Sequence, residues 1–546
     1  MTMQYSRTLK SSAQSLPSPD GAYIATILPS ALTIRSTRSL EILHTRALPV
    51  DFSTSIAWFL WSNSSDRLLI ATSDLIKIYS ASDPQFKANI VNPTSGTVKI
   101  THISFGSSDN EVNVLSEFGL KLTVFNLLTS KSVDINSPKF FNRNVASRGL
   151  CYRPGTSNLT LLTRSGGKDI LSIHARETLE VVRSWSLETV DAQGVSWSPD
   201  GRWLAVLESA GQGHKIFFYT ADRYLYKVWN GPMPMTEEDR DIDLGAGVKY
   251  LEWSSTGAHI AIGDYSKRVT ILAVPSFSEI MSFQHVPSLR PEETLQIWLE
   301  QVSPQNGVMA RGFVKASQVT CPPTASLTPT TNKDVKSGTI AMAFDASGTL
   351  LATRTEDFPT SVWIWDVTTK ILRANLILHA PVAKMTWHPK INELLMLRCE
   401  GEETKGLTHL WDPSWESPRI VDFASQLPGG KLIGKSIASW LNVDAVYPVI
   451  FFSDSQDCLL TSIADGANDD LPWEETSAKA FDIYGDREES PLNLVGADEK
   501  RPFRRVTVNL ADAEADDSIL DMCPSEESEE FDDTFQFKKA VDPTNQ

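Results

Sequence analysis

The stretch that decides the fold is Val195-Ser-Trp-Ser-Pro-Asp-Gly-Arg-Trp-Leu-Ala-Val-Leu207, followed by Lys215-Ile-Phe-Phe-Tyr219. Its apolar runs predict one strand, a turn, a second strand and, after a gap, a third strand. The Pro-Asp-Gly turn has a physical basis, because Pro presets φ, Asp hydrogen-bonds to nearby backbone and Gly tolerates positive φ. The unit is therefore a short antiparallel sheet made of consecutive strands.

The same unit recurs along the chain. Each copy carries an anchor residue ahead of its apolar strands, and the anchor is aromatic in every copy except the first. The anchors stand at positions 17, 61, 105, 152, 197, 253, 344, 387 and 440, with gaps of 44, 44, 47, 45, 56, 91, 43 and 53 residues. A period near 45 residues is typical of the four-stranded blade of a β-propeller, about 40–45 residues long. An ordinary β-sandwich has no such period, so the sequence predicts an all-β, WD-type β-propeller.

Residues at the turns and strand ends strengthen this prediction. Four turns are of the Ser-Pro-Asp-Gly kind, and two Trp-Asp dipeptides close a unit where the WD signature belongs. Most units lack the Gly-His start and the Trp-Asp end, so we expect apolar packing to hold blades two to six together. The residues that carry the repeat signature are Pro19, Asp20, Gly21, Trp61, Trp197, Pro199, Asp200, Gly201, Trp253, Trp365, Asp366, Trp387, Trp411, Asp412 and Trp440.

The number of blades stays open between nine and ten. Trp298 lies 45 residues after Trp253, so residues 275–337 form either a degenerate blade or an insertion. Nine or ten blades exceed the usual four to eight, which leaves one wide ring or two unequal propellers. We favour a single closed assembly in which the segment from Tyr5 to Lys10 pairs with the last blade and removes a free sheet edge.

Charge divides the chain into two regions. Residues 465–546 hold 23 Asp and Glu against 8 Lys and Arg, a net charge of −15. The whole chain carries −17, so the first 464 residues carry only −2. We expect residues 1–464 to form the propeller and residues 465–546 to form an acidic, largely disordered tail. Because a nucleic-acid surface needs concentrated basic charge, we expect no nucleic-acid partner. Two islands in the tail, Arg501–Leu510 and Phe531–Lys539, are either docking motifs or solvated sequence.

No apolar run approaches the roughly 20 residues of a membrane span, and the N-terminus shows no signal pattern. The five cysteines are scattered without metal-ligand spacing, which argues against zinc and disulfides and favours a reducing, cytoplasmic compartment. We expect no cofactor and no metal.

One motif resembles a phosphate-binding loop. Gly429-Gly-Lys-Leu-Ile-Gly-Lys-Ser436 matches G-x-x-x-x-G-K-S, but that loop functions only where it joins a strand to a helix. Here the next blade is due, so we expect a strand after Ser436 and no nucleotide site. The histidines are dispersed, and His379 is expected to make a structural hydrogen bond in the core. We therefore predict no catalytic residue and no enzyme, with a P-loop nucleotide hydrolase as the alternative of another class.

The segment Gly338-Thr-Ile-Ala-Met-Ala-Phe-Asp-Ala-Ser-Gly-Thr-Leu-Leu-Ala-Thr-Arg-Thr-Glu-Asp-Phe-Pro-Thr-Ser-Val-Trp-Ile-Trp-Asp366 closely resembles the WD-repeat protein eight family of spindle-pole and centrosome proteins. The opening Pro17-Ser-Pro-Asp-Gly21 and the unit at Trp253 fit that family in order and spacing. The likeness covers about residues 1–460, whereas the tail and the Thr/Pro-rich stretch 319–337 depart from it. No family binding residue can be transferred to this chain.

The resemblance implies a scaffold at the spindle pole body or centrosome, a cytoskeletal microtubule-organising centre. It would act with a coiled-coil microtubule-anchoring partner, recruit a kinesin-14 motor, anchor microtubule minus ends and help to organise the mitotic spindle. An alternative is a propeller subunit of another complex, in translation initiation, a vesicle coat or a ubiquitin ligase. The residues themselves leave the partner-binding site unknown.

Overall fold

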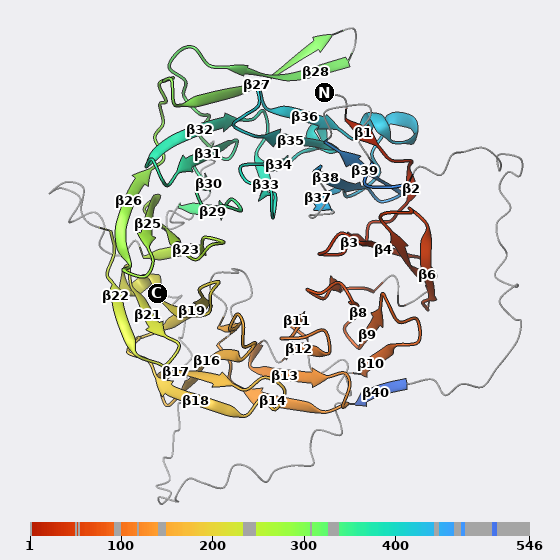
Figure 1. Ribbon diagram of the computed structural model, residues 1–546, viewed down its shortest axis with the longest axis vertical. Helices are drawn as coiled ribbons and strands as arrows, with labels where there is room; N and C mark the ends of the chain where they lie inside the picture. Colours follow the sequence, from red (N-terminus) through yellow and green to blue (C-terminus); the bar gives the residue numbers. More distant parts are fainter. Residues whose placement is uncertain are drawn as a thin grey trace, which may run out of the picture.

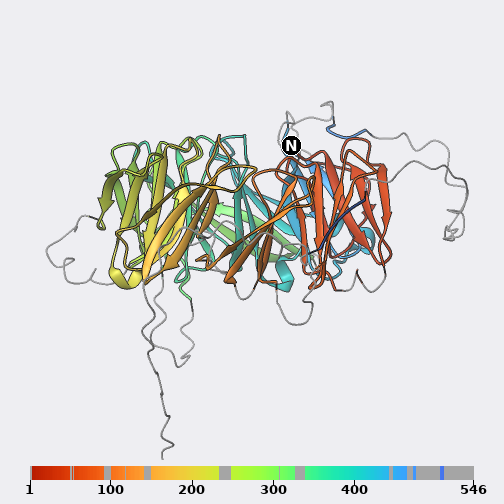
Figure 2. The same cartoon turned by 90° about the horizontal axis from the view of Figure 1, so that it is seen from below.

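Nine blades close into a single ring (Figure 1). The computed structural model describes residues 3–49, 52, 55–91, 100–116, 119–139, 149–232, 247–305, 308–325, 338–441, 447–463, 471–474 and 505–509. Seen from the side, the ring is a flat disc (Figure 2). The all-β propeller that the sequence predicts is confirmed, and its blades form one ring rather than two unequal propellers.

In each blade the first strand lies toward the centre of the ring and the last strand lies on the rim (Figure 1). Blades 1 to 3 consist of β3 (Ser15–Pro17), β4 (Tyr23–Leu28), β5 (Ala31–Ser36) and β6 (Ile42–Ala47); β7 (Trp58–Trp61), β8 (Arg67–Ala71), β9 (Leu75–Ser80) and β10 (Lys87–Val91); and β11 (His102–Phe105), β12 (Glu111–Ser116), β13 (Lys121–Asn126) and β14 (Ser132–Asn136). Blades 4 to 6 consist of β15 (Leu150–Tyr152), β16 (Leu159–Ser165), β17 (Lys168–His174) and β18 (Val181–Ser186); β19 (Ala192–Trp197), β20 (Trp203–Glu208), β21 (Ile216–Thr220) and β22 (Leu225–Trp229); and β23 (Val248–Trp253), β24 (His259–Asp264), β25 (Arg268–Ala273) and β26 (Ser278–Gln284).

Of the last three blades, blade 8 keeps this plan, whereas blades 7 and 9 depart from it at their edges. Blades 7 and 8 consist of β29 (Thr339–Phe344), β30 (Leu350–Thr355), β31 (Ser361–Asp366) and β32 (Ile371–Ile377); and β33 (Val382–Trp387), β34 (Leu395–Cys399), β35 (Leu407–Trp411) and β36 (Arg419–Asp422). Blade 9 has three strands from its own stretch of chain, β37 (Ile437–Leu441), β38 (Val449–Ser453) and β39 (Asp457–Ser462).

The N-terminus completes blade 9. β1 (Gln4–Tyr5) and β2 (Leu9–Lys10) pair antiparallel with β39, with Tyr5 opposite Thr461 and Leu9 opposite Cys458. This pairing confirms the predicted closure by the segment from Tyr5 to Lys10. Because strands from both ends of the repeat region share one sheet, the ring has no free edge at its seam.

The stretch between blades 6 and 7 holds a hairpin and not a blade. β27 (Gln296–Gln305) pairs with β28 (Val308–Lys315), and β27 also adds in parallel to β32, so the sheet of blade 7 has six strands. The hairpin lies outside the ring of blades (Figure 1). Trp298, which the 45-residue spacing offered as a tenth anchor, sits in β27 and packs against blades 7 and 8.

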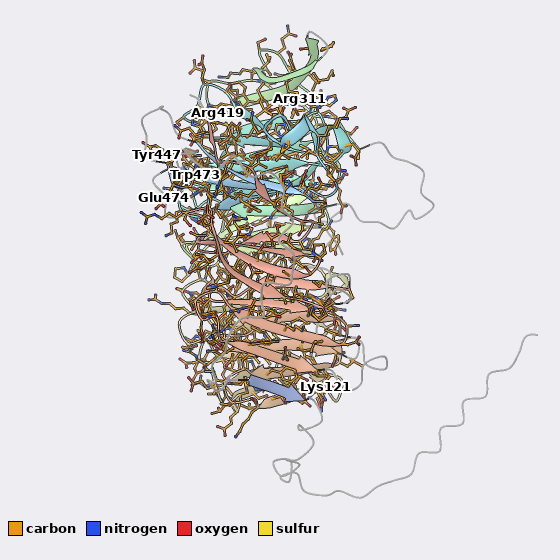
Figure 3. All side chains as sticks on the ribbon, turned by 90° about the vertical axis from the view of Figure 1, so that its right-hand side faces the viewer. Lys121, Arg311, Arg419, Tyr447, Trp473 and Glu474 are labelled. Carbon is orange, nitrogen blue, oxygen red and sulfur yellow. The ribbon has the colours of Figure 1, made fainter. Side chains whose placement is uncertain are left out.

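Two short parts of the region after residue 464 lie against the ring. Trp473 is 2% exposed and packs with Leu9 and Leu441 at the seam (Figure 3). Backbone residues of β40 (Arg505–Asn509) pair in parallel with β10, so a piece of the first tail island forms an extra outer strand of blade 2. The second island, Phe531–Lys539, lies outside the described residues.

The core is divided among the interfaces between blades. Nine separate clusters of buried apolar side chains each lie between two neighbouring blades. The cluster that contains Leu9 and Leu441 spans the seam between blades 9 and 1. The middle strands supply most of these residues because both of their faces are covered, which explains their nearly continuous apolar runs. Each fully buried side chain contributes about 1.5–3 kcal/mol, so the blades are stabilised mainly through their neighbours.

The predicted anchors join successive blades by hydrogen bonds. Indole nitrogens donate from Trp61 to Leu16 O at 3.1 Å, from Trp253 to Ser196 Oγ at 3.2 Å, from Trp387 to Ala343 O at 2.8 Å and from Trp440 to Thr386 O at 3.2 Å. Each acceptor residue directly precedes the anchor of the blade before. Trp197 instead donates to Thr160 Oγ1 at 2.8 Å. The period in the sequence is thus the spacing of the contacts that join the blades.

Candidate interaction surface

A groove opens on the rim of the ring between blades 4 and 5. It has a volume of about 530 Å³ and is lined by Arg183, Asp222, Arg223 and Tyr224. Arg183 belongs to β18, the outer strand of blade 4, and the other three belong to the turn between β21 and β22 of blade 5. Arg183 Nη1 donates to Asp222 Oδ1 at 2.8 Å. This ion pair bridges the two blades across the groove.

Large apolar side chains stand exposed on the outer strands β18 and β22, which flank this groove, and on the turn before β22. Tyr224 is 73% exposed, Val181 58%, Val182 54% and Tyr226 52%. Together with Arg183 and Arg223, these four residues form what we call the rim patch. Tyr and Arg are enriched at protein interfaces.

Aromatic contacts fix the outer strand of blade 5 on the side that faces blade 6. The rings of Tyr226 and Trp203 have centroids 4.8 Å apart, and Trp203 meets Phe277 of the neighbouring blade edge-on at 5.2 Å. Lys227 Nζ donates to the main-chain carbonyl of Phe277 at 2.7 Å. Because these contacts fix the outer strand of blade 5 against blade 6, a partner would meet a surface that needs little ordering on binding.

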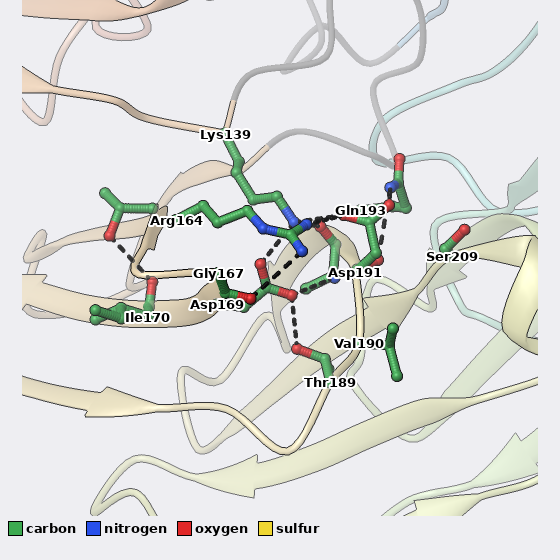
Figure 4. A network of polar contacts seen from close by, with 12 residues as sticks. Lys139, Arg164, Gly167, Asp169, Ile170, Thr189, Val190, Asp191, Gln193 and Ser209 are labelled. Carbon is green, nitrogen blue, oxygen red and sulfur yellow. Dashed lines mark hydrogen bonds and ion pairs between the residues drawn. The ribbon is translucent and has the colours of Figure 1, made fainter. Parts of the chain in front are cut away.

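An ionic network joins blades 4 and 5 (Figure 4). Lys139 Nζ lies 2.7 Å from Asp169 Oδ1 and 2.8 Å from Asp191 Oδ1, and Arg164 Nη1 donates to the same Asp191 oxygen at 2.9 Å. The Asp169 side chain is fully buried. Burial alone would raise the pKa of Asp169, but hydrogen bonds from Lys139, the Ala192 N–H and Thr189 outweigh it and lower the pKa. The carboxylate therefore stays charged and holds the two blades in register.

The repeat-signature residues position the blades, and none of them lines the rim groove. In the first turn Asp20 Oδ1 accepts from the Ala22 N–H at 2.9 Å, and Asp200 Oδ1 accepts from the Arg202 N–H at 3.1 Å. Gly21 and Gly201 have positive φ, as the turn requires. Asp366 and Asp412 close the third strands of blades 7 and 8 by accepting main-chain N–H groups of the next turn.

A polar network joins the end of blade 6 to blade 7, and no motif in the sequence announces it. His285 Nε2 lies 2.8 Å from Thr353 Oγ1, and Trp365 Nε1 donates to the same oxygen at 3.0 Å. Burial lowers the pKa of His285 to about 4. The prediction of a structural role for the ring of His379 is wrong, because that side chain is exposed and its main-chain N–H donates instead, to Glu300 Oε2 at 2.8 Å. His285 directly follows β26, and no sequence motif marks it.

Glu300 fixes the added hairpin to blade 8. Its Oε1 lies 3.1 Å from Arg311 Nη1 on β28 and 3.0 Å from His409 Nε2 on β35, and the carboxylate is fully buried. Burial alone would raise the pKa of Glu300, but the hydrogen bond and charge of His409, the His379 N–H and Arg311 lower it to about 2. The hairpin is therefore a fixed part of the rim.

The phosphate-loop motif adopts a different structure. Residues 428–430 form the 3-10 turn η6 (Pro428–Gly430), and Ser436 leads directly into strand β37 rather than into a helix. Gly434 has a φ of 72°, and a Cβ there would meet Ser455 Oγ at 2.2 Å. The prediction of a strand after Ser436 is confirmed, and the glycines serve a turn.

Other possible site types leave no trace in the described ranges. No three His, Cys, Asp or Glu side chains come together there as metal ligands would. The four described cysteines, Cys151, Cys321, Cys399 and Cys458, have free thiols. No described helix is long and apolar enough to cross a membrane.

Fold and repeat contacts together define a WD-type β-propeller. No family model matches the chain. It is similar to the mouse WD repeat-containing protein WRAP73, with 25% identity over 418 residues that cover 73% of this chain and 84% of that protein. It is also similar to an uncharacterized WD repeat-containing protein of Schizosaccharomyces pombe, with 24% identity over 417 residues that cover 73% and 80%. Both relatives support a WD-repeat assignment.

Solved structures show weaker likeness. A eukaryotic initiation factor has a TM-score of 0.47 at 8% identity, over 77% of this chain and 90% of that one. The C-terminal WD40 domain of Sif2 has a TM-score of 0.41 at 10% identity, over 85% and 99%. We draw no conclusion from TM-scores this low, and the fold rests on the nine sheets themselves.

Proposed function

We propose that this chain is a non-enzymatic WD-repeat scaffold that binds a protein partner through the rim patch of blades 4 and 5. The observation that carries the proposal is the groove of about 530 Å³ flanked by exposed Tyr224 and Val181 and bridged by the Arg183–Asp222 ion pair. WD propellers typically bind proteins rather than transform substrates, which agrees with the role of the signature residues as joints between blades.

The partner proposed is an elongated segment of a coiled-coil protein. Such a segment can lay apolar side chains along the groove while its flanking charges meet Arg223 and the Arg183–Asp222 pair. The resemblance to the WD-repeat protein eight family supports a coiled-coil microtubule-anchoring protein as this partner and a kinesin-14 motor as the third member. It also supports the spindle pole body, or the equivalent microtubule-organising centre, as the place of action and minus-end anchoring as the role.

The test is affinity purification from mitotic cells with quantitative mass spectrometry. The double variant Val181→Asp/Tyr224→Ala should lose the coiled-coil partner and the motor, because it removes apolar contact and adds an unpaired charge. Leu43→Asp is the matched control, since Leu43 is 45% exposed on the outer strand of blade 1, and it should keep both partners.

Localisation provides a separate readout. The tagged chain should concentrate at spindle poles, and the double variant should spread through the cytosol. A wild-type chain that stays diffuse throughout mitosis and captures no coiled-coil protein would refute the proposal.

A further inference from the structure

A second cavity lies between blades 8 and 9. Its volume is about 200 Å³, and its lining includes three cationic side chains, Arg398, Lys405 and Lys435, together with Ser436 and the ring of Phe452. Arg398 is the penultimate residue of β34 in blade 8, Lys435 precedes β37 of blade 9 and Phe452 lies in β38. The cavity therefore uses two residues of the G-x-x-x-x-G-K-S motif, Lys435 and Ser436.

Arg398 is held in place by a contact that leaves its charge unbalanced. Its Nη2 donates to the main-chain carbonyl of Ser436 at 2.8 Å, which fixes the guanidinium across the blade interface. Among the described residues no carboxylate pairs with it. Arg164 occupies the matching strand end of blade 4, and there the acceptor is the carboxylate of Asp191. Blade 8 thus offers a positioned cation where blade 4 has a completed ion pair.

Lys435 adds a second unbalanced charge. Its main-chain N–H donates to Ser455 Oγ at 3.2 Å, so the backbone that carries it is fixed, while its side chain is exposed at the mouth of the cavity. Within the described ranges its ammonium group forms no ion pair. Lys405, the third cation, pairs with Glu402. The lining itself contains no carboxylate, so the cavity has two positive charges without a partner.

Ser436 adds a hydroxyl group to the lining of the cavity. It is 7% exposed, and its hydroxyl has no hydrogen-bond partner among the described side chains and backbone groups. Phe452 also lines the cavity, and its apolar side chain is 1% exposed. Because this ring excludes water, a charge inside the cavity interacts more strongly with Arg398 than it would in solvent.

We propose that this cavity binds a phosphate group. Two unpaired cations match the charge of a phosphate dianion better than that of a single carboxylate, and a planar guanidinium with a neighbouring hydroxyl suits tetrahedral oxygens. One phosphate, with the chain atoms that carry it, fits a cavity of this volume. The phosphate belongs either to a phosphorylated side chain of a partner or to a free phosphate ion, and no bond is made or broken.

Isothermal titration calorimetry on the full chain tests the proposal with two probes. These are inorganic phosphate and N-acetyl-O-phosphoserine N-methylamide, each titrated at constant ionic strength and about pH 7.5, where phosphate is mainly a dianion. At least one probe should bind with saturation. Lys435→Met should weaken that binding tenfold or more, because a hydrogen bond to a charged group is lost.

Matched variants separate this site from general charge effects. Lys431→Met is the control, because Lys431 is an exposed lysine of the same loop that does not line the cavity, and it should bind as the wild type does. Ser436→Ala should weaken binding by a smaller factor while the ring stays folded, which melting temperature would verify. If Arg398→Met fails to fold, Lys435→Met and Ser436→Ala still decide the outcome.

The two probes also identify the source of the phosphate. Tighter binding of the phosphoserine mimic supports a phosphorylated partner, and tighter binding of inorganic phosphate supports a free ion. Absence of saturable binding by both probes, or equal binding by wild type and Lys435→Met, would overturn the proposal.

Discussion

Trp387 Nε1 donates a hydrogen bond of 2.8 Å to the main-chain carbonyl of Ala343, which lies directly before the anchor of the preceding blade. Comparable bonds from Trp61, Trp253 and Trp440 reach the residue before the previous anchor. The indole therefore has two functions, since its ring fills the core between two blades and its N–H fixes their register.

Replacing Trp387 with Phe should lower the free energy of unfolding by more than the same change at Trp411. Both rings are buried, but Trp411 Nε1 has no hydrogen-bond partner among the described atoms, so Trp411→Phe removes packing alone. The additional loss at Trp387 should be about 1–2 kcal/mol, since the Ala343 carbonyl is left without its donor. Denaturant unfolding of the two variants measures the difference, and equal losses would contradict the role of the bond.

Glu300→Gln should destabilise the added hairpin and blade 8 together. The change removes the buried negative charge that Arg311 and His409 surround, and an unpaired buried cation costs about 3–5 kcal/mol. Glu293→Gln is the control, because Glu293 is exposed in the segment leading to the same hairpin. The midpoint of thermal unfolding should fall for Glu300→Gln and stay within error for Glu293→Gln.

The ring should lose stability as pH falls from about 6.5 to 4. Burial lowers the pKa of both His285 and His388 to about 4, against about 6.5 for an unfolded chain. A histidine whose pKa is lowered in the folded state stabilises the fold fully above its unfolded-state pKa. This stabilisation is lost as the pH falls from the unfolded-state pKa to the folded-state pKa. Glu252, whose pKa burial raises to about 7, acts in the opposite direction, but two histidines oppose this one carboxyl.

His388→Asn tests this pH dependence at one residue. His388 Nδ1 accepts from the main-chain N–H groups of Lys390 and Ile391, and an Asn oxygen can accept the same bonds without titrating. The variant should lose up to about 3 kcal/mol less than the wild type between pH 7 and 4. His379→Asn, at an exposed ring, should leave the pH profile unchanged. Identical profiles for wild type and His388→Asn would show that His388 is not the titrating group.

A chain cut after residue 474 should be more stable than one cut after residue 464. Both keep all nine blades, but the shorter chain loses Trp473, which fills the seam, and the hydrogen bond from the Glu474 N–H to Arg38 O at 2.7 Å. Loss of a buried Trp costs about 3–5 kcal/mol. Trp473→Ala in the full chain should reproduce most of the difference in melting temperature. If the two cuts melt alike, the contact at the seam contributes little.

The blade repeat could be predicted because its determinants are local. A Pro-Asp-Gly turn and an aromatic anchor act within a few residues, and the closing segment from Tyr5 to Lys10 follows from the need to cover an edge. The hairpin of residues 296–315 could not be predicted, because its parallel pairing with β32 joins residues about 80 positions apart and Trp298 happens to keep the blade spacing.

The sites escaped prediction for the same reason. Arg398 and Ser436 are ordinary residues in the sequence, and only the packing of blade 8 against blade 9 brings them together. His285 and Thr353 stand 68 residues apart, so composition and spacing carried no sign of their contact. The motif around Lys435 leads into strand β37 as predicted, but the prediction of a strand did not reveal the cavity that the lysine lines.

The seam at blade 9 also sets an order of events during synthesis. β1 and β2 are made first, yet the strand that they pair with, β39, ends at Ser462. At about 5–20 residues per second, the first strands wait for tens of seconds before their partner leaves the ribosome. Throughout that time blade 1 presents an apolar face that blade 9 will later cover. The nascent chain is therefore an unclosed ring that exposes an apolar surface at each end. Its yield in cells should depend on chaperones that cover these surfaces until the ring closes.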